Sequence, residues 1–125
     1  MPIKPGRSAS VELLVTDADT ALAAKSGEVP VLGTPRIVAL VEEAAMASIN
    51  GALDPGQTTV SMQVQLDHLA PTAVGHTVTA EATVDKVVGR RVIFTVSVND
   101  ERGLVAVGRV TRVVVDTERF LEKTH

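Results

Sequence analysis

Alternation of apolar and polar residues is the feature that most constrains how this chain can fold. Between residues 60 and 68, every second position is held by Val60, Met62, Val64, Leu66 or His68, and polar residues lie between them. A period of two places these five side chains on one face of a β-strand. Twenty-two of the 125 residues are valine, and β-branched side chains favour a sheet over a helix. Further strands are predicted over residues 8–16, 78–84, 91–98 and 104–115.

One helix is predicted between the first strand and the turn at residues 54–56. Thr34 can cap free N–H groups, and Pro35 has a φ angle suited to the first helical position. The helix is therefore expected over residues 35–50, with Gly51 after its C-terminus. On a helical wheel Glu43 lies on the polar side, whereas Glu42 falls at the margin of a wide apolar sector. That sector contains Ile37, Val38, Leu40, Val41, Ala44, Ala45, Ser48 and Ile49.

Length and composition exclude several classes of function. A chain of 125 residues, 45% of them apolar, is expected to form a single domain over residues 1–125. The absence of cysteine excludes disulfides, a thiol nucleophile and thiolate metal ligands. A net charge of −3 and only two aromatic rings besides histidine argue against a nucleic-acid partner. No leader or membrane-spanning segment is visible, so we expect a cytoplasmic protein without a membrane partner.

Three polar residues are candidates for chemistry. Glu42 lies against the apolar sector of the helix, where a carboxylate is poorly hydrated. His68 is expected on the apolar face of its strand, where an imidazole could orient that carboxylate or exchange protons with it. Thr34 precedes Glu42 by eight residues, just over two helical turns. Each also has a purely structural interpretation: Thr34 as a helix cap, Glu42 as a charged residue at the margin of the apolar sector, and His68 as a core histidine.

The other two histidines, His76 and His125, are expected to be solvated. One follows a turn glycine and the other is the C-terminal residue. The three histidines have no spacing typical of a metal site, so no metal is predicted.

The segments around the three candidates resemble one family. Thr34 and Glu42 are followed by His68 in the run DHLAPTAVGHTVTAEA, and the later runs GRRVIFTVSVND and RVTRVVVDTERF extend the match. These segments are similar to the fluoroacetyl-CoA thioesterase-like family of hotdog-fold thioesterases. That family has threonine, glutamate and histidine at the same spacings, eight and then twenty-six residues. The resemblance covers roughly residues 31–120.

The resemblance implies the α+β hotdog fold, a curved antiparallel sheet of about five strands wrapped around one long central helix, in agreement with the element order above. It implies a homodimer or a dimer of dimers, formed by pairing of edge strands, with active sites at the subunit boundary. The implied activity is hydrolysis of an acyl-CoA thioester without a metal. No cofactor is implied, because coenzyme A is part of the substrate.

The resemblance also implies a role for each site residue. Glu42 would act either as a nucleophile, through an anhydride, or as the base for water. His68 would handle the proton, and Thr34 would supply a hydrogen bond that forms or polarises the site. Arg112 stands where the family has an arginine that contacts the substrate.

Two departures from the family bear on the substrate. In the family's best-known member, aromatic rings before the threonine cover the acyl group, but residues 23–33, AAKSGEVPVLG, contain none. In addition, Ser61 replaces a family glycine near the start of the histidine strand. A short or medium acyl chain is therefore expected, rather than specificity for a fluorinated acetyl group.

Two alternatives on the same fold remain. A hydratase acting on enoyl thioesters usually presents aspartate and histidine close together on the helix side, and the predicted helix has no histidine. A non-catalytic hotdog module could bind acyl thioesters or another apolar ligand, and it would lose no turnover when Glu42 or His68 is replaced. Fold alone does not fix function, so the site residues have to separate these alternatives.

Overall fold

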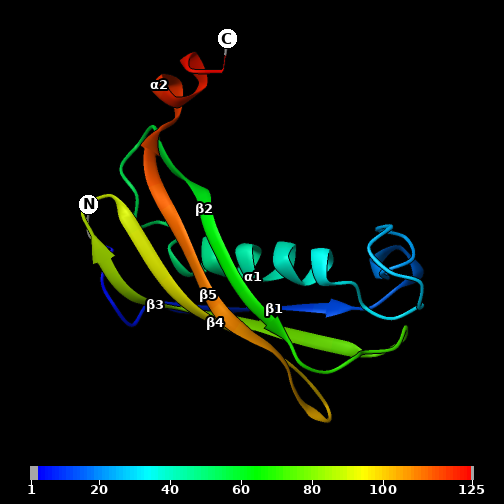
Figure 1. The fold of residues 1–125 in the computed structure, drawn as a ribbon. Helices are drawn as coiled ribbons and strands as arrows, with labels where there is room; N and C mark the ends of the chain where they lie inside the picture. The colour runs from blue at the N-terminus through cyan, green and yellow to red at the C-terminus, as the bar shows by residue number, and fades with distance from the viewer. Residues whose placement is uncertain (1–2, 125) are drawn as a thin grey trace.

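A curved antiparallel sheet and one long helix form the body of the protein (Figure 1). The computed structural model describes residues 3–124. In chain order the elements are β1 (Ser8–Leu14), a 3₁₀ helix η1 (Asp17–Asp19), α1 (Thr34–Ser48), β2 (Gln57–His68), β3 (Thr77–Val88), β4 (Arg91–Asp100), β5 (Gly103–Asp116) and α2 (Thr117–Glu122). All five predicted strands and the predicted long helix are present, most of them with longer or slightly shifted bounds.

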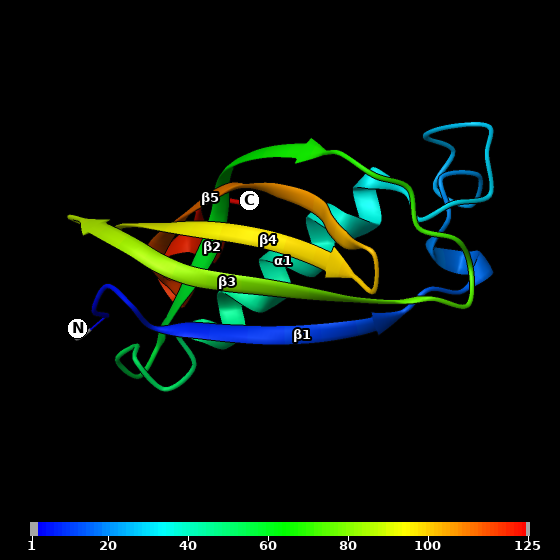
Figure 2. The ribbon, with the colours of Figure 1, turned by 90° about the horizontal axis from the view of Figure 1, so that it is seen from below.

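The sheet wraps around α1, as the resemblance implies. Its strand order is β1-β3-β4-β5-β2, and every neighbouring pair is antiparallel. Figures 1 and 2 show α1 lying across the concave face of the sheet, where it contacts all five strands. Strands β1 and β2 form the two edges, so β2 has one side without a partner strand among residues 3–124.

The face of α1 toward the sheet is the apolar sector predicted from the sequence. Glu42 is half-buried at the margin of this face, and Glu43 is exposed, both as predicted. Small residues such as Ala44 and Ala45 let the strands approach closely. The fully buried residues of the sector are Ile37, Leu40, Val41, Ala44, Ala45, Ser48 and Ile49.

The start of α1 differs from the prediction, because Thr34 is not its cap. Gly33 holds the N-cap position with an extended backbone, and no side chain caps the helix. Thr34 is instead the first helical residue and Pro35 the second. The hydroxyl of Thr34 is therefore available to another partner.

A β-bulge interrupts the alternation that the sequence predicts for β2. The register between β2 and β5 steps from the pair Ser61–Arg112 to the pair Gln63–Thr111, which leaves Met62 as the extra residue. An extra residue reverses which side chains of a strand point to each face.

The bulge moves Thr59 into the interior. Thr59 is 3% exposed, whereas Val60 is only half-buried. The prediction that Val60 shares a face with His68 is therefore wrong. Val64 and Leu66, which lie beyond the bulge, do pack against the core from the same face as His68.

The C-terminal helix α2 is not predicted by the sequence. Its N-cap is Asp116, whose side chain accepts a hydrogen bond from the backbone N–H of Arg119 at 3.2 Å. Figure 1 shows α2 standing away from the sheet at the end of β5. Neither α2 nor α1, the two α-helices of residues 3–124, is long and apolar enough to cross a membrane.

Gly108 marks a close approach of β5 to β2, and its replacement tests that approach. A Cβ atom at this position would collide with the backbone carbonyl oxygen of Gln65 and lie 2.9 Å from Cα of Leu66. We predict that Gly108→Ala lowers the free energy of unfolding by about 2 kcal/mol or more, because the neighbour is backbone and cannot rotate away. Urea unfolding measures the change.

The control is Ser10→Ala, at an exposed position of β1. It should change the free energy of unfolding by no more than about 0.5 kcal/mol. Equal stability of Gly108→Ala and the wild type would contradict the close approach of β2 and β5.

Candidate active site

Thr34 and His68 join the start of α1 to the end of β2. Oγ1 of Thr34 lies 2.8 Å from Nδ1 of His68, although the two residues are 34 positions apart in the sequence. Because Gly33 holds the cap position, the hydroxyl forms this bond instead of capping the helix. The bond fixes the orientation of the imidazole ring.

The second ring nitrogen of His68 is buried and has no partner. Nε2 is the one buried side-chain nitrogen or oxygen within residues 3–124 that makes no hydrogen bond. Buried polar atoms are nearly always paired, so an unpaired one indicates a position prepared for a ligand or a proton. A shallow hollow of about 220 Å³ lies beside the ring and is otherwise lined by Val31, Leu69, Ala70 and Pro71.

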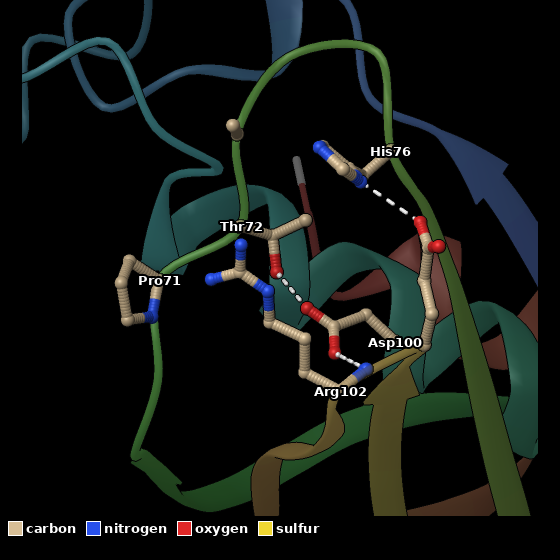
Figure 3. Close-up of a pocket in the computed structure, with 7 residues that line it drawn as sticks. Pro71, Thr72, His76, Asp100 and Arg102 are labelled. Atoms are coloured by element: carbon tan, nitrogen blue, oxygen red, sulfur yellow. Dashed lines mark hydrogen bonds and ion pairs between the residues drawn. The ribbon is translucent and has the colours of Figure 1, made fainter.

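Polar contacts brace the loop that follows His68. Oγ1 of Thr72 donates to Oδ2 of Asp100 at 3.2 Å, and Nδ1 of His76 lies 2.8 Å from Oε1 of Glu101 (Figure 3). The turn between β4 and β5 therefore holds the loop from the side. His76 is exposed, as predicted, and His125 lies outside the described residues.

Glu42 faces Arg112 of β5. Nη1 of Arg112 donates to Oε1 of Glu42 at 2.8 Å, and the two side chains are 10% and 25% exposed. Burial lowers the pKa of Arg112, and the Glu42 carboxylate acts in the opposite direction by favouring the charged guanidinium. Arg112, which the resemblance implies as a substrate contact, is therefore also the ion-pair partner of Glu42.

Thr59 is a residue of the site that the sequence did not single out. Its Oγ1 accepts a hydrogen bond from Nε of Arg112 at 2.9 Å, and its carbonyl oxygen accepts one from Nη2 at 2.9 Å. Strict alternation along β2 would place Thr59 on the outer face, and only the bulge turns it inward. Ser61, the residue that replaces the family glycine, pairs directly with Arg112 in the register of β2 and β5.

Within one chain the expected site residues form two separate pairs. Thr34 contacts His68 and Glu42 contacts Arg112, and no hydrogen bond within residues 3–124 joins Glu42 to His68. Thr34 and Glu42 are eight residues apart, which is about 12 Å along the axis of α1. Over the same residues, no group of three or more histidine, aspartate or glutamate side chains could hold a metal ion.

An ion pair ties the start of α1 to the segment before it. Nε of Arg36 donates to Oδ1 of Asp19 at 3.0 Å, and the N–H and hydroxyl of Thr16 donate to Oδ2. Burial raises the pKa of Asp19, but the hydrogen bonds from Thr16 and the charge and hydrogen bond of Arg36 outweigh it and hold the pKa below 3.8. The contact fixes the turn of α1 that carries Thr34.

A family model described as fluoroacetyl-CoA-specific thioesterase matches residues 15–118. The chain belongs to this family. One relative, a fluoroacetyl-CoA thioesterase from Streptantibioticus cattleyicolor, is 32% identical over 93 residues, which cover 74% of this chain and 67% of the relative.

Solved structures agree with this family assignment. A thioesterase superfamily member from Thermus thermophilus has a TM-score of 0.91 at 29% identity and covers 98% of this chain and 91% of its own. A hot-dog-like protein from Thermanaerovibrio acidaminovorans has a TM-score of 0.89 at 27% identity, with 96% and 89% covered. This member of the family therefore has the hotdog fold and is a thioester hydrolase. The family assignment favours thioester hydrolysis over the two alternatives, an enoyl thioester hydratase and a non-catalytic binding module.

The Asp19 contact predicts a pH-dependent contribution to the stability of this thioesterase. Because the pKa of Asp19 is lower in the folded chain, the contribution is present above the ordinary value of 3.8 and is lost as the pH falls through the folded value. Asp19→Asn should therefore unfold at lower urea than wild type near pH 7, and the difference should shrink toward pH 2. Asp17→Asn, at an exposed position, is the control. A difference that stays constant over this range would contradict the role of the ionised carboxylate.

Proposed function

We propose that this chain hydrolyses a short or medium acyl-CoA thioester, with Glu42 and His68 as its catalytic residues. The proposed reaction uses no metal and no separate cofactor, because coenzyme A enters as part of the substrate. The observation that carries the proposal is the unpaired, buried Nε2 of His68, on a ring whose other nitrogen is held by Thr34. A fixed imidazole with one free nitrogen is suited to proton transfer.

Glu42 would act on the carbonyl carbon of the thioester. As a nucleophile, its carboxylate would bond to that carbon, the C–S bond would break, and water would then hydrolyse the resulting anhydride. As a base, it would take a proton from water while the water oxygen attacks the carbon. In both routes the sulfur leaves with a proton that His68 supplies. The ion pair with Arg112 would hold the Glu42 carboxylate in a fixed position for either role.

Thr34 and Arg112 would support the two catalytic groups. Thr34 orients the ring of His68 through the 2.8 Å bond to Nδ1. Arg112 carries five N–H groups, of which three are used by Glu42 and Thr59, so two remain for a substrate oxygen.

We further propose that two chains complete each site by pairing along the free edge of β2. An unpaired edge strand is a natural template for a second strand. Met62, on β2, is 49% exposed, and Leu69, just after β2, is 58% exposed. Pairing here would cover both residues and would bring His68 of one chain toward Glu42 of the other. The separation of the two pairs within one chain supports this arrangement.

The proposed substrate range rests on the surroundings of His68. Apart from His68 itself, the hollow beside the ring is lined by aliphatic residues and by no aromatic side chain, and its wall includes Val31 from the segment before α1. An acyl chain of a few carbons can make apolar contacts there, whereas nothing in the lining distinguishes a C–F bond from a C–H bond.

We predict that wild-type protein releases coenzyme A from acetyl-, butyryl- or hexanoyl-CoA and shows no preference for fluoroacetyl-CoA over acetyl-CoA. In a thiol-release assay Glu42→Gln and His68→Ala should each lower kcat by roughly 100-fold or more, the usual contribution of a positioned acid or base. Thr34→Val should also be slower, and Thr34→Ser should retain most activity because it keeps the hydroxyl.

The matched control for Glu42→Gln is Glu43→Gln, which replaces the neighbouring exposed glutamate. It should keep wild-type kcat. No hydrolysis of any ester by the wild type, or unchanged rates in Glu42→Gln and His68→Ala, would rule out the proposed function.

Sharing of the site between two chains has its own test. Sedimentation should give about twice the mass of one chain, as for a symmetric dimer. Co-expression of Glu42→Gln with His68→Ala should restore about a quarter of wild-type activity, because half of the dimers would be mixed and each would hold one intact site. No recovery in confirmed mixed dimers would mean that Glu42 and His68 act within one chain.

A further inference from the structure

Arg112 is a buried cation that donates hydrogen bonds to two partners, Glu42 and Thr59. The residue is 8% exposed, and each of its three side-chain nitrogens donates a hydrogen bond. One of these bonds reaches Glu42, and the other two reach Thr59. Thr59 therefore supplies most of the contacts that fix the plane of the guanidinium.

The two hydrogen bonds to Thr59 also determine where the third hydrogen bond of Arg112 points. A guanidinium is planar, and its N–H groups form a rigid fork. With Nε and Nη2 held 2.9 Å from the two Thr59 oxygens, Nη1 points toward α1, where it meets Oε1 of Glu42 at 2.8 Å. Thr59 itself is 3% exposed and also contacts Sδ of Met46 on α1 at 3.1 Å. Its side chain is thus confined between the helix and β5.

We propose that Thr59 is a positioning residue that holds Arg112 against Glu42 and thereby sets the orientation of the Glu42 carboxylate. The consequence for turnover rests on the proposed function of Glu42, whereas the contact with Arg112 does not. The β-bulge after Ser61 is the structural device that makes it possible, because without the extra residue the side chain of Thr59 would point to the outer face.

The hydroxyl is the part of Thr59 that matters most. Thr59→Val keeps the shape and the backbone carbonyl but leaves Nε–H of Arg112 without an acceptor in a buried place, which is costly. Thr59→Ser keeps the hydroxyl and loses only a methyl group. The pair of variants therefore separates the hydrogen bond from packing. Thr58→Val is the control, since Thr58 is the neighbouring half-buried threonine of β2.

The first measurement is the ¹⁵N NMR signal of the Arg112 Nε–H group, assigned by its loss in Arg112→Lys. In the wild type and in Thr59→Ser this proton should exchange slowly with water. In Thr59→Val the signal should broaden or vanish, and in Thr58→Val it should be unchanged. A fast-exchanging Nε–H in the wild type, or a protected one in Thr59→Val, would overturn the proposal whether or not the protein hydrolyses thioesters.

The second measurement is steady-state hydrolysis of the best acyl-CoA ester. Thr59→Val should lower kcat roughly 10-fold to 100-fold, the range that loss of a buried hydrogen-bond partner spans, while KM stays within about 2-fold. Thr59→Ser should restore kcat. Equal loss in Thr59→Ser and Thr59→Val would indicate a packing role and overturn the proposal. Absence of turnover in the wild type would instead reject the proposed function. The NMR result alone would then test the hydrogen bond between Thr59 and Arg112.

Discussion

The burial of the Arg112 guanidinium against a valine-rich sheet is the constraint on which the rest of the site depends. A buried charge is stable only when it is paired and its hydrogen bonds are satisfied. Arg112 meets this condition through Glu42 of α1 and Thr59 of β2. One residue of β5 thus links the helix to the edge strand. The bulge in β2 follows from the same need, because it turns Thr59 toward Arg112 while His68, farther along the strand, still faces α1.

The second constraint is the fit between a curved sheet and a helix with small side chains. Ala44, Ala45 and Ser48 are fully buried, so the strands can close around α1. This geometry brings the last residue of β2 to the first residue of α1, where Thr34 takes His68 as its partner. The core packing and the chemistry of the site therefore use the same helix: its buried face holds the sheet, and its margins carry Thr34 and Glu42.

The sequence predicts most of the fold, because period-two alternation and the Thr34-Pro35 pair are strong local signals. It also predicts the half-buried position of Glu42. What it misses depends on contacts distant in the chain. The bulge at Met62 adds one residue without a local pattern, so nothing in the sequence indicates that Thr59 faces the interior. Thr34 looked like a cap because its bond to His68 joins residues 34 positions apart. Helix α2 has only six residues and buries none of them.

The central claim is that Glu42 and His68 act on one thioester, and a crystal structure with a non-hydrolysable acyl-CoA analogue tests it most directly. The carbon that replaces the thioester carbonyl should lie within about 3.5 Å of the Glu42 carboxylate, as a near-attack geometry requires. Nε2 of His68, from the same or the paired chain, should lie within hydrogen-bond reach of the sulfur position, about 3.2 Å or one water away. An acyl group bound away from both residues, with Nε2 still unpaired, would contradict the claim.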